Sequence, residues 1–378
     1  MNERNLQPGE DALDADLVFA ASGCAYAAQR SLERELWWAG LPDPVVTGPK
    51  EPEAKDGHPG VSLWWRSLRG RTDWTGHAAQ RALSAAKYLM RAASMAFMHQ
   101  WFLEFLASHP LLQACVGCDP RLQERHLHRF VNRQWHRMDR VLALQAHYRL
   151  LLERWPAELF EKVYVHGRAT LGSLQLKDGS EARLHLRPPA FMTCEGELTL
   201  ELTDASDRTL YRLVMTVIDD DTLAIGCIQG ATGPHARETV RELTRNMHGM
   251  RPKQLMLVLA YAFAGQLGLQ RILAVGNAAH PLQGRTRLFS DYDAYWLEQG
   301  GTAVEGGWFQ MPATLHHRTE VELESKRRAL FRRRADLRWE AVKLLNDALR
   351  PVPWWRDATE VSAAMESLPP LPDVTRAA

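Results

Sequence analysis

The sequence predicts a mixed α/β protein of the α+β kind, whose core spans about residues 160–315. Three observations support this class. Residues 77–106 place an apolar side chain at every third or fourth position, as an amphipathic helix does. After Pro156 the pattern changes to short segments in which apolar and polar residues alternate, as in 197–202. The segment 252–267 is apolar on nearly every face, which predicts a buried helix inside the core.

Five segments follow one another along the chain. We expect an irregular N-terminal extension with a short helix near 25–38, then a helical cap made of the runs 77–106 and 120–155. A mixed α/β core, a long basic C-terminal helix and a proline-rich tail complete the chain. The expected boundaries are 1–75, 76–156, 157–315, 316–350 and 351–378.

Within the core, turn residues separate the expected elements, as Asp178–Gly179 does between the first two strands. The strands are expected at 169–176, 182–187, 197–202, 210–217, 223–229, 269–276 and 308–311. A polar helix is expected at 234–247, the buried helix at 252–267 and a short helix at 292–299.

Bulk composition limits the function classes. Of 378 residues, 46% are hydrophobic and 24% are charged, which is ordinary for a globular protein. The formal net charge of +1 excludes a global field that attracts nucleic acid or membrane, so such partners would need a local patch. No apolar run approaches the roughly 18 residues that span a bilayer, and the N-terminus lacks a secretory pattern. We therefore expect a cytoplasmic protein without a transmembrane segment.

Cysteine and histidine do not form a recognisable metal motif. Five cysteines are too few for a disulfide scaffold, which indicates a reducing compartment. Cys115 and Cys118 form a single C-x-x-C, for which we favour a structural role over a redox role. His126, His128 and His136 lack the H-E-x-x-H spacing. We expect no metal site.

Several segments together resemble the VirK/YbjX family of bacterial proteins, a domain of unknown function of the DUF535 type. They are CEGEL at 194–198, IGCIQG at 225–230, LTRNMHGMRPK at 243–253, YDAYW at 292–296 and SKRR at 325–328. The resemblance covers about residues 80–345. It implies a cytoplasmic bacterial protein linked to virulence, envelope remodelling and stress responses. It implies no established reaction and no catalytic residues.

The order of elements in the core is also similar to that of GNAT acyltransferases. This similarity implies a GNAT-like central twisted sheet and an acyl-CoA donor, whose pyrophosphate would lie on backbone amides at a helix start. The corresponding helix here starts at Arg251-Pro252-Lys253. The glycine-rich Q/R-x-x-G-x-G/A loop of that family is absent from the sequence.

A strand end and this helix start form the candidate ligand site. Basic residues oppose the dipole at a helix N-terminus unless an anion compensates, so we expect an anionic small molecule there. Acyl-CoA or another phosphate-bearing ligand would fit. The residues concerned are Gln229, Gly230, Gly249, Arg251 and Lys253. The alternatives are a simple turn at Gly230 and salt bridges of the cations to Glu195, Glu197 or Glu242.

Two carboxylates are candidates for a general base. Glu195 and Glu197 lie two apart on an expected strand, so their side chains point to the same face, and His248 would lie nearby. The alternative pairs both carboxylates with Arg245 or Arg251. A GNAT-like site would take its acid from a further group of residues: Asp291, Tyr292, Asp293 and Tyr295. An amphipathic helix explains the presence of these residues equally well.

The C-terminal helix carries a dense basic run, made of Lys326, Arg327, Arg328, Arg332, Arg333 and Arg334. Such a run could bind nucleic acid or anionic lipid, or it could be a solvated face paired with nearby acids. Two functions therefore remain. The first is an acyltransferase with a GNAT-like core and catalytic candidates Glu195, Glu197 and His248. The second is a non-enzymatic regulator that binds a partner through the basic helix.

Overall fold

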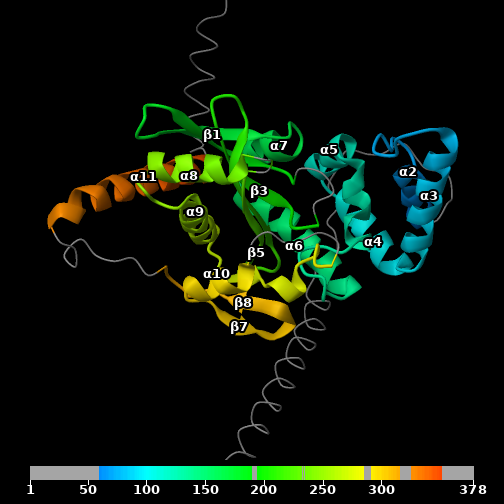
Figure 1. Ribbon diagram of the computed structural model, residues 1–378. Coiled ribbons are helices and arrows are strands. Elements are labelled where there is room, and N and C mark those ends of the chain that lie inside the picture. The colour runs from blue at the N-terminus through cyan, green and yellow to red at the C-terminus, as the bar shows by residue number, and fades with distance from the viewer. Residues whose placement is uncertain are drawn as a thin grey trace, which may run out of the picture. The chain divides into compact units, whose positions relative to one another are not determined.

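The computed structural model describes residues 59–189, 194–231, 233, 235–284, 291–315 and 325–350 (Figure 1). These residues belong to one compact unit, His58–Ala378. Helices come first in the described chain, and a mixed core with an eight-stranded sheet follows. The short helix expected near 25–38 and the tail 351–378 lie outside the described residues. Among the helices of the described ranges, none has the length and hydrophobicity to cross a bilayer.

Short helices form the first part of the described chain. They are α2 (Pro59–Ser67), α3 (Ala78–Ala93), α4 (Ala96–Ala107), α5 (Pro110–Cys118), η1 (Pro120–Leu127), α6 (Arg137–Arg154) and α7 (Ala157–Tyr164). Three of these helices, α2, α5 and η1, begin at a proline, whose missing N–H costs nothing in the first turn. His109 caps α5 by accepting a hydrogen bond from Leu111 N–H, and Asp119 caps η1 by accepting one from Arg121 N–H.

This helical part is more divided than the sequence predicted. The run 77–106 forms two helices, because Met95 has a non-helical backbone between them. The run 120–155 starts as the 3-10 helix η1 and continues as α6 only from Arg137. Backbone hydrogen bonds of the intervening segment go to distant parts of the chain, which overrides its helical pattern. Cys115 and Cys118 both lie in α5.

The sheet has the order β1-β2-β3-β4-β5-β6-β8-β7. Its strands are β1 (Ala169–Gln175), β2 (Glu181–Arg187), β3 (Leu198–Thr203), β4 (Thr209–Val217), β5 (Thr222–Gly230), β6 (Arg271–Val275), β7 (Thr302–Val304) and β8 (Trp308–Gln310). Only the β5–β6 pair in this sheet is parallel. The crossover that a parallel pair requires runs through α8 (Ala236–Asn246) and α9 (Pro252–Gln266). The short helix α10 (Tyr292–Glu298) lies between β6 and β7 in sequence. This order confirms the predicted mixed α/β fold.

The two faces of the sheet differ in chemistry. One face is apolar, with Leu186, Leu200 and Leu213 side by side on β2, β3 and β4. Helices α8 and α9 and the long helix α11 (Ser325–Leu349) cover this face (Figure 1). A Cβ at Gly230 would touch Val240 of α8, and α11 packs on α9 and β1. The opposite face carries polar side chains in the next register positions, among them Thr199, Glu201, Arg212 and Gln229.

Most strands of the core agree with the sequence prediction to within one or two residues at each end. The strand β7 was missed, since its three residues are all exposed and give no burial pattern. Glu197 was expected inside the third strand, but β3 begins at Leu198, so Glu195 and Glu197 both precede the strand. The alternation of side chains along a strand therefore does not place these two carboxylates on one face, and each has different neighbours.

Candidate functional site

The parallel strands β5 and β6 separate part-way along their length. Thr222–Ile225 pair with Arg271–Ala274, and beyond this ladder β5 continues to Gly230 without a partner in β6. The carboxyl ends of parallel strands are a common place for ligands in open sheets, because the strands leave an opening there. Helix α9 packs against β4, β5 and β6 beside it.

Gly226 lies at this separation. It is the extra residue of a bulge in β5, since the register with β4 shifts at this point. A Cβ at Gly226 would lie 1.8 Å from the carbonyl oxygen of Glu195, which no side chain can tolerate. Glycine here therefore allows the segment before β3 to lie directly against β5, and this contact brings Glu195 beside Cys227.

A group of seven side chains, here called the Cys227 cluster, surrounds the separation. Its members are Glu195, Arg212, Cys227, Gln229, Lys253, His280 and Tyr292. The Tyr292 hydroxyl donates to Cys227 Sγ over 3.4 Å, and Cys227 Sγ lies 3.9 Å from Gln229 Oε1. Gln229 Oε1 also accepts a hydrogen bond of 2.9 Å from Arg212. The charges of Glu195 and Arg212 both act on the thiol.

Glu195 and His280 form a buried pair within the Cys227 cluster. His280 Nε2 lies 3.5 Å from Glu195 Oε1, and both side chains are almost completely buried. His280 Nδ1 accepts a hydrogen bond from Leu282 N–H, so the neutral ring carries its proton on Nε2, facing the carboxyl group. The imidazole also stacks on the Tyr292 ring, with centroids 5.3 Å apart. Carboxyl, imidazole and phenol are thus held as one unit.

Protonation in the Cys227 cluster follows from burial. Burial raises the pKa of Cys227 to about 12, and the nearby Glu195 charge acts in the same direction. Burial also raises the pKa of Tyr292 well above its usual range, with Cys227 as the next cause. At neutral pH the thiol and the phenol are both protonated, so both can donate a hydrogen bond.

Lys253 lies at the first turn of α9, on the side of α10. Its Nζ stands 3.5 Å from the centroid of the Tyr295 ring and 5.6 Å from that of Tyr292. Burial lowers the pKa of Lys253 to about 8, while the charges of Cys227, Glu298 and Asp291 oppose this shift. The ammonium group is therefore held by aromatic rings and distant charges, and it forms no ion pair among the described residues.

A loop of the helical part holds the backbone on both sides of the Glu195–His280 pair. Val131 N–H donates to the carbonyl of Cys194 over 2.6 Å, and Arg133 N–H donates to the carbonyl of Ala279 over 2.8 Å. Asn132 adds a side-chain hydrogen bond of 2.8 Å to the carbonyl of Gly306. Val131 has φ +52°, which is a strained conformation for a β-branched residue. We call residues 130–133 the clamp segment.

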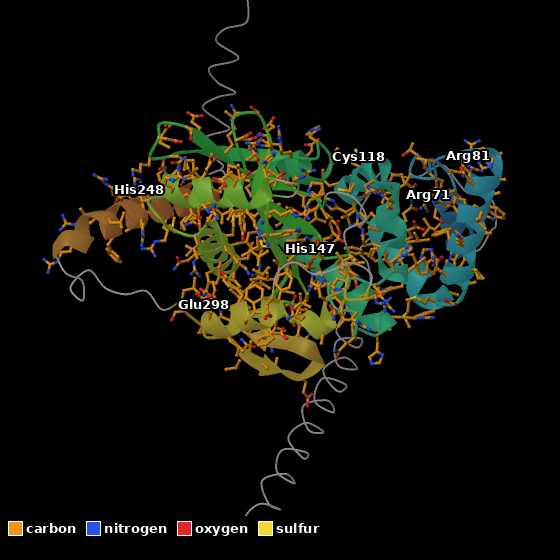
Figure 2. All side chains as sticks on the ribbon, in the orientation of Figure 1. Arg71, Arg81, Cys118, His147, His248 and Glu298 are labelled. Atoms are coloured by element: carbon orange, nitrogen blue, oxygen red, sulfur yellow. The ribbon has the colours of Figure 1, made fainter. Side chains whose placement is uncertain are left out.

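The predicted ligand residues do not meet in a single cradle. The carbonyl of His248 accepts a hydrogen bond from Arg334 of α11, and Gly249 has φ +76° beside the same guanidinium group. Arg251 forms an ion pair of 3.0 Å with Glu298, in which both side chains are more than half exposed. Figure 2 shows His248 next to α8 and α11, whereas Glu298 lies on α10. Of this predicted set, Gln229 and Lys253 belong to the Cys227 cluster.

Glu197 lies in a different environment from Glu195. Its carboxyl group accepts a hydrogen bond of 2.7 Å from Tyr148 and lies 3.3 Å from the guanidinium group of Arg125. The side chain is fully buried, and burial raises its pKa against the opposing charge of Arg125. No described contact joins Glu195, Glu197 and His248. The pairing of Glu197 with an arginine matches the structural alternative, with Arg125 in place of the arginines expected from the sequence.

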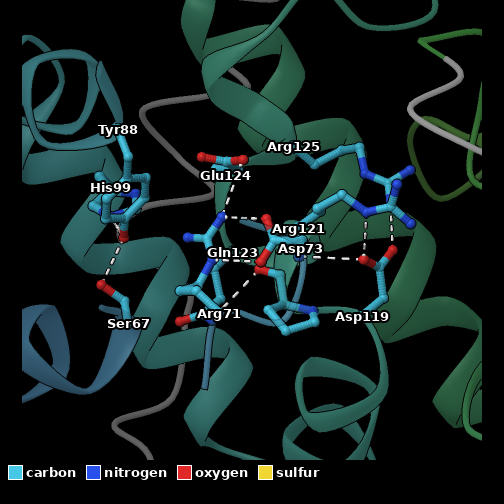
Figure 3. A network of polar contacts seen from close by, with 11 residues as sticks. Ser67, Arg71, Asp73, Tyr88, His99, Asp119, Arg121, Gln123, Glu124 and Arg125 are labelled. Atoms are coloured by element: carbon cyan, nitrogen blue, oxygen red, sulfur yellow. Dashed lines mark hydrogen bonds and ion pairs between the residues drawn. The ribbon is translucent and has the colours of Figure 1, made fainter. Parts of the chain in front are cut away.

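The helical part contains a second polar network (Figure 3). Arg71 is buried and forms ion pairs with Asp73 and Glu124. Beside it, the Tyr88 hydroxyl lies 2.8 Å from His99 Nε2, and His99 Nδ1 lies 3.1 Å from His126 Nε2. Burial lowers the pKa of His99 to about 4, so this imidazole is neutral at pH 7. The network fixes α3 against α4 and η1.

The basic run of the C-terminal helix lies on α11. Arg328, Arg332 and Arg333 are exposed, and Arg334 is half-buried against the His248 carbonyl. The side chains of Lys326 and Arg327 lie outside the described residues. In the described ranges, no three histidine, cysteine, aspartate or glutamate side chains lie close enough together to hold a metal ion.

Four of the sequence segments that carry the family resemblance converge on the Cys227 cluster. They contribute Glu195, then Cys227 with Gln229, then Lys253, and finally Tyr292. Arg212 and His280 come from outside these segments, and no motif connects them with the other members of the cluster. The only available signal for Arg212 was its place as a lone cation in the strand 210–217.

Most of the chain is similar to known proteins. Residues 77–343 match a family model described as "Protein of unknown function (DUF535)". The chain is similar to the "Uncharacterized protein YbjX" of Escherichia coli (strain K12), at 28% identity over 73% of this chain and 86% of that protein. An uncharacterised protein of Haemophilus influenzae is 23% identical over 62% of this chain and 80% of its own length.

Two further matches are more distant. "Membrane protein LapB" of Mannheimia haemolytica is 24% identical over 46% of this chain and 74% of that protein. Among solved structures, a cAMP-binding acyltransferase from Mycobacterium smegmatis, determined as a point mutant, matches at 12% identity with a TM-score of 0.23. That match covers 54% of this chain and 62% of the other, which is less than two thirds of its length.

Proposed function

The chain belongs to the DUF535 family of proteins of unknown function, and from this premise we propose that it is an acyltransferase. Its donor would be a thioester that carries phosphate groups, of the acyl-CoA type. One observation supports the proposal above the others. A protonated phenol and a carboxyl–imidazole pair meet where the two parallel strands of a GNAT-like sheet separate. Fold alone would not support a reaction, but this placement of acid and base does.

The proposed reaction has balanced proton transfers. The acceptor attacks the thioester carbonyl and loses its proton to Glu195, whose carboxyl group lies 3.5 Å from His280 Nε2. The bond between the carbonyl carbon and sulfur breaks, and the leaving thiolate takes the proton of the Tyr292 hydroxyl. Exchange with solvent then returns a proton to Tyr292 and removes one from Glu195. The neutral Cys227 thiol beside Tyr292 remains unchanged.

Two groups of side chains would hold the reactants. Lys253 and the exposed Arg251 at the start of α9 both contact residues of α10, and we assign these two cations to the phosphate groups of the donor. Arg212 and Gln229 stand on the polar face of the sheet and would orient the acceptor. Arg212 bonds only to this neutral amide in the described residues, so its positive charge is not neutralised by a carboxylate there.

Binding of the donor can be tested without knowledge of the acceptor. Acetyl-CoA and free CoA should raise the melting temperature of the full-length protein, because a ligand of the native state stabilises it. Lys253→Met should reduce this shift by more than half, since it removes the partly buried cation. The matched control is Lys343→Met, which removes an exposed lysine paired with Asp347 on α11. Equal shifts in both variants, or no shift with any CoA thioester, would contradict the proposal.

Turnover should depend on the Tyr292 hydroxyl. Tyr292→Phe should slow the release of free thiol from acetyl-CoA by about 100-fold or more, which is the usual contribution of a general acid. The CoA-induced melting shift should persist, because the phenyl ring remains. Tyr261→Phe is the control, since its hydroxyl bonds the Pro312 carbonyl away from the Cys227 cluster. If both variants release thiol at the native rate, Tyr292 is not the acid.

A further inference from the structure

Helix α3 exposes an apolar surface. Only Tyr88 and Ala92 of this helix are buried. Leu83 is 54% exposed and Met90 is 69% exposed, and Leu89 is exposed as well. Exposed alanines continue the same surface at positions 79, 82, 86 and 93. Contiguous apolar side chains at a protein surface mark an interaction site more often than chance exposure does.

The spacing along α3 places these side chains together. Leu83 and Met90 are seven residues apart and so lie on one side of the helix, with Lys87 between them. Tyr88 points to the opposite side, where its hydroxyl donates to Ser67 of α2 and meets His99 of α4. The buried network therefore holds α3 in place, and the apolar side is fixed outward without a contribution from Leu83 or Met90.

Positive charge surrounds this surface. Helix α3 contains Arg81, Lys87 and Arg91 and no acidic residue, and Figure 2 shows Arg81 on this helix. None of the three forms an ion pair in the part of the chain that the structure describes. Arg137 adds a fourth cation at the end of the helix, where it bonds the carbonyl of Ser94 over 2.9 Å. The sequence has no acidic residue between Asp73, which pairs with Arg71, and Glu104.

We propose that this α3 surface, made of Leu83, Lys87, Leu89, Met90 and Arg91, docks on a membrane that contains anionic lipid. An apolar stripe with flanking cations is the pattern of helices that lie in the membrane interface. The apolar side chains enter the acyl boundary, while lysine and arginine extend to the headgroups and gain from the negative surface potential. The proposal is independent of acyl transfer.

Two other partner classes fit the α3 surface less well. Nucleic acid would use the cations, but phosphate contacts do not require leucine and methionine at the centre. A protein interface would favour the apolar side chains, but lysine is depleted from the core of such interfaces, and Lys87 stands between Leu83 and Met90. A bilayer accommodates both, because a lysine side chain can place its stem in the apolar layer and its charge in water.

Vesicle binding tests the proposal with the full-length protein. It should sediment with vesicles of equal parts phosphatidylglycerol and phosphatidylcholine, and much less with phosphatidylcholine alone. The double variant Leu83→Asp/Met90→Asp should lower the partition coefficient by about tenfold or more, because it puts negative charge where apolar contact is expected. Lys87→Glu/Arg91→Glu should have a similar effect that high salt masks. Both side-chain pairs are exposed, so the melting temperature should stay the same.

The matched control lies on α11, which also presents arginine and an exposed aromatic ring. Arg333→Glu/Trp339→Asp should leave vesicle binding unchanged. If this variant loses binding and the α3 variants keep it, the basic C-terminal helix is the membrane contact and the proposal fails. DNA binding that disappears in Lys87→Glu/Arg91→Glu but survives in Leu83→Asp/Met90→Asp would indicate nucleic acid instead.

A further outcome concerns protein partners. If the native protein does not bind vesicles and Leu83→Asp/Met90→Asp lowers the melting temperature by several degrees, another protein surface covers α3. The acidic segment 1–57 of this chain or a second copy would then be the occupant, and the proposal is overturned. A failure of the CoA experiments would leave the vesicle result unaffected, so the two proposals can be separated.

Discussion

Glu197→Gln should reduce the free energy of unfolding by about 3 kcal/mol, because it removes one of the two carboxylates that pair with the buried guanidinium group of Arg125 and leaves it only Asp119 among the described residues. Arg125 lies 3.3 Å from the Glu197 carboxyl group, and only 12% of the arginine side chain is exposed. Glutamine keeps the size and the contact to Tyr148, so the loss measures charge rather than packing. Chemical denaturation with urea would give the free energy directly.

An exposed ion pair supplies the control for this experiment. Glu158→Gln breaks the pair with Lys162 on α7, where both side chains are more than half exposed. Solvent screens the attraction between exposed charges, so this variant should unfold nearly as the native protein does. If Glu197→Gln costs no more than Glu158→Gln, the buried carboxyl group is uncharged in the folded protein and the Arg125–Glu197 pair does not connect the helices to the sheet.

Gly226→Ala should lower the free energy of unfolding by about 3 kcal/mol or more, because the added methyl group would clash with main-chain atoms, which cannot rotate away as a side chain can. The new Cβ would stand 1.8 Å from the carbonyl oxygen of Glu195, and a main-chain oxygen cannot move without its strand. We also expect the thiol of Cys227 to react faster with a maleimide in the native state, since the segment that covers it would be displaced.

Gly117→Ala is the appropriate comparison for Gly226→Ala. Gly117 lies in α5, and a Cβ there would meet nothing within 4 Å. Alanine favours a helix over glycine by about 1 kcal/mol, so this variant should be as stable as the native protein or slightly more stable. Equal stability of the two alanine variants would show that Glu195 does not lie against β5.

The sheet could be predicted from the sequence because local patterns encode it. The alternation in 197–202 predicts a strand and the continuous apolar run 252–267 predicts a buried helix, and each pattern lies within a single segment. The helical part was harder, since residues 128–136 fall inside the run 120–155 that was expected to be helical, but Val131 and Arg133 donate their N–H groups to Cys194 and Ala279 instead. Tertiary hydrogen bonds decided the structure of that segment, and no local pattern records them.

The Cys227 cluster could be predicted only in pieces. The sequence placed Glu195, Gln229 and Lys253 among the candidates because each lies in a polar position near an expected strand end or helix start. It paired Glu195 with Glu197 and His248, which assumed that both glutamates lie on a strand. The structure instead pairs Glu195 with His280, and this partner lies far along the chain with no motif around it. Long-range pairing of this kind leaves no mark on a single sequence.

The clamp segment has a consequence for the order of biosynthesis. Residues 130–133 leave the ribosome well before Cys194, Ala279 and Gly306, the three residues whose carbonyl groups they bind. Until those residues have been synthesised, the N–H groups of the clamp segment must form hydrogen bonds with water or with a chaperone. A nascent chain that stops short of Ala279 therefore holds every helix of the first part but cannot align the His280 imidazole with the Glu195 carboxyl group.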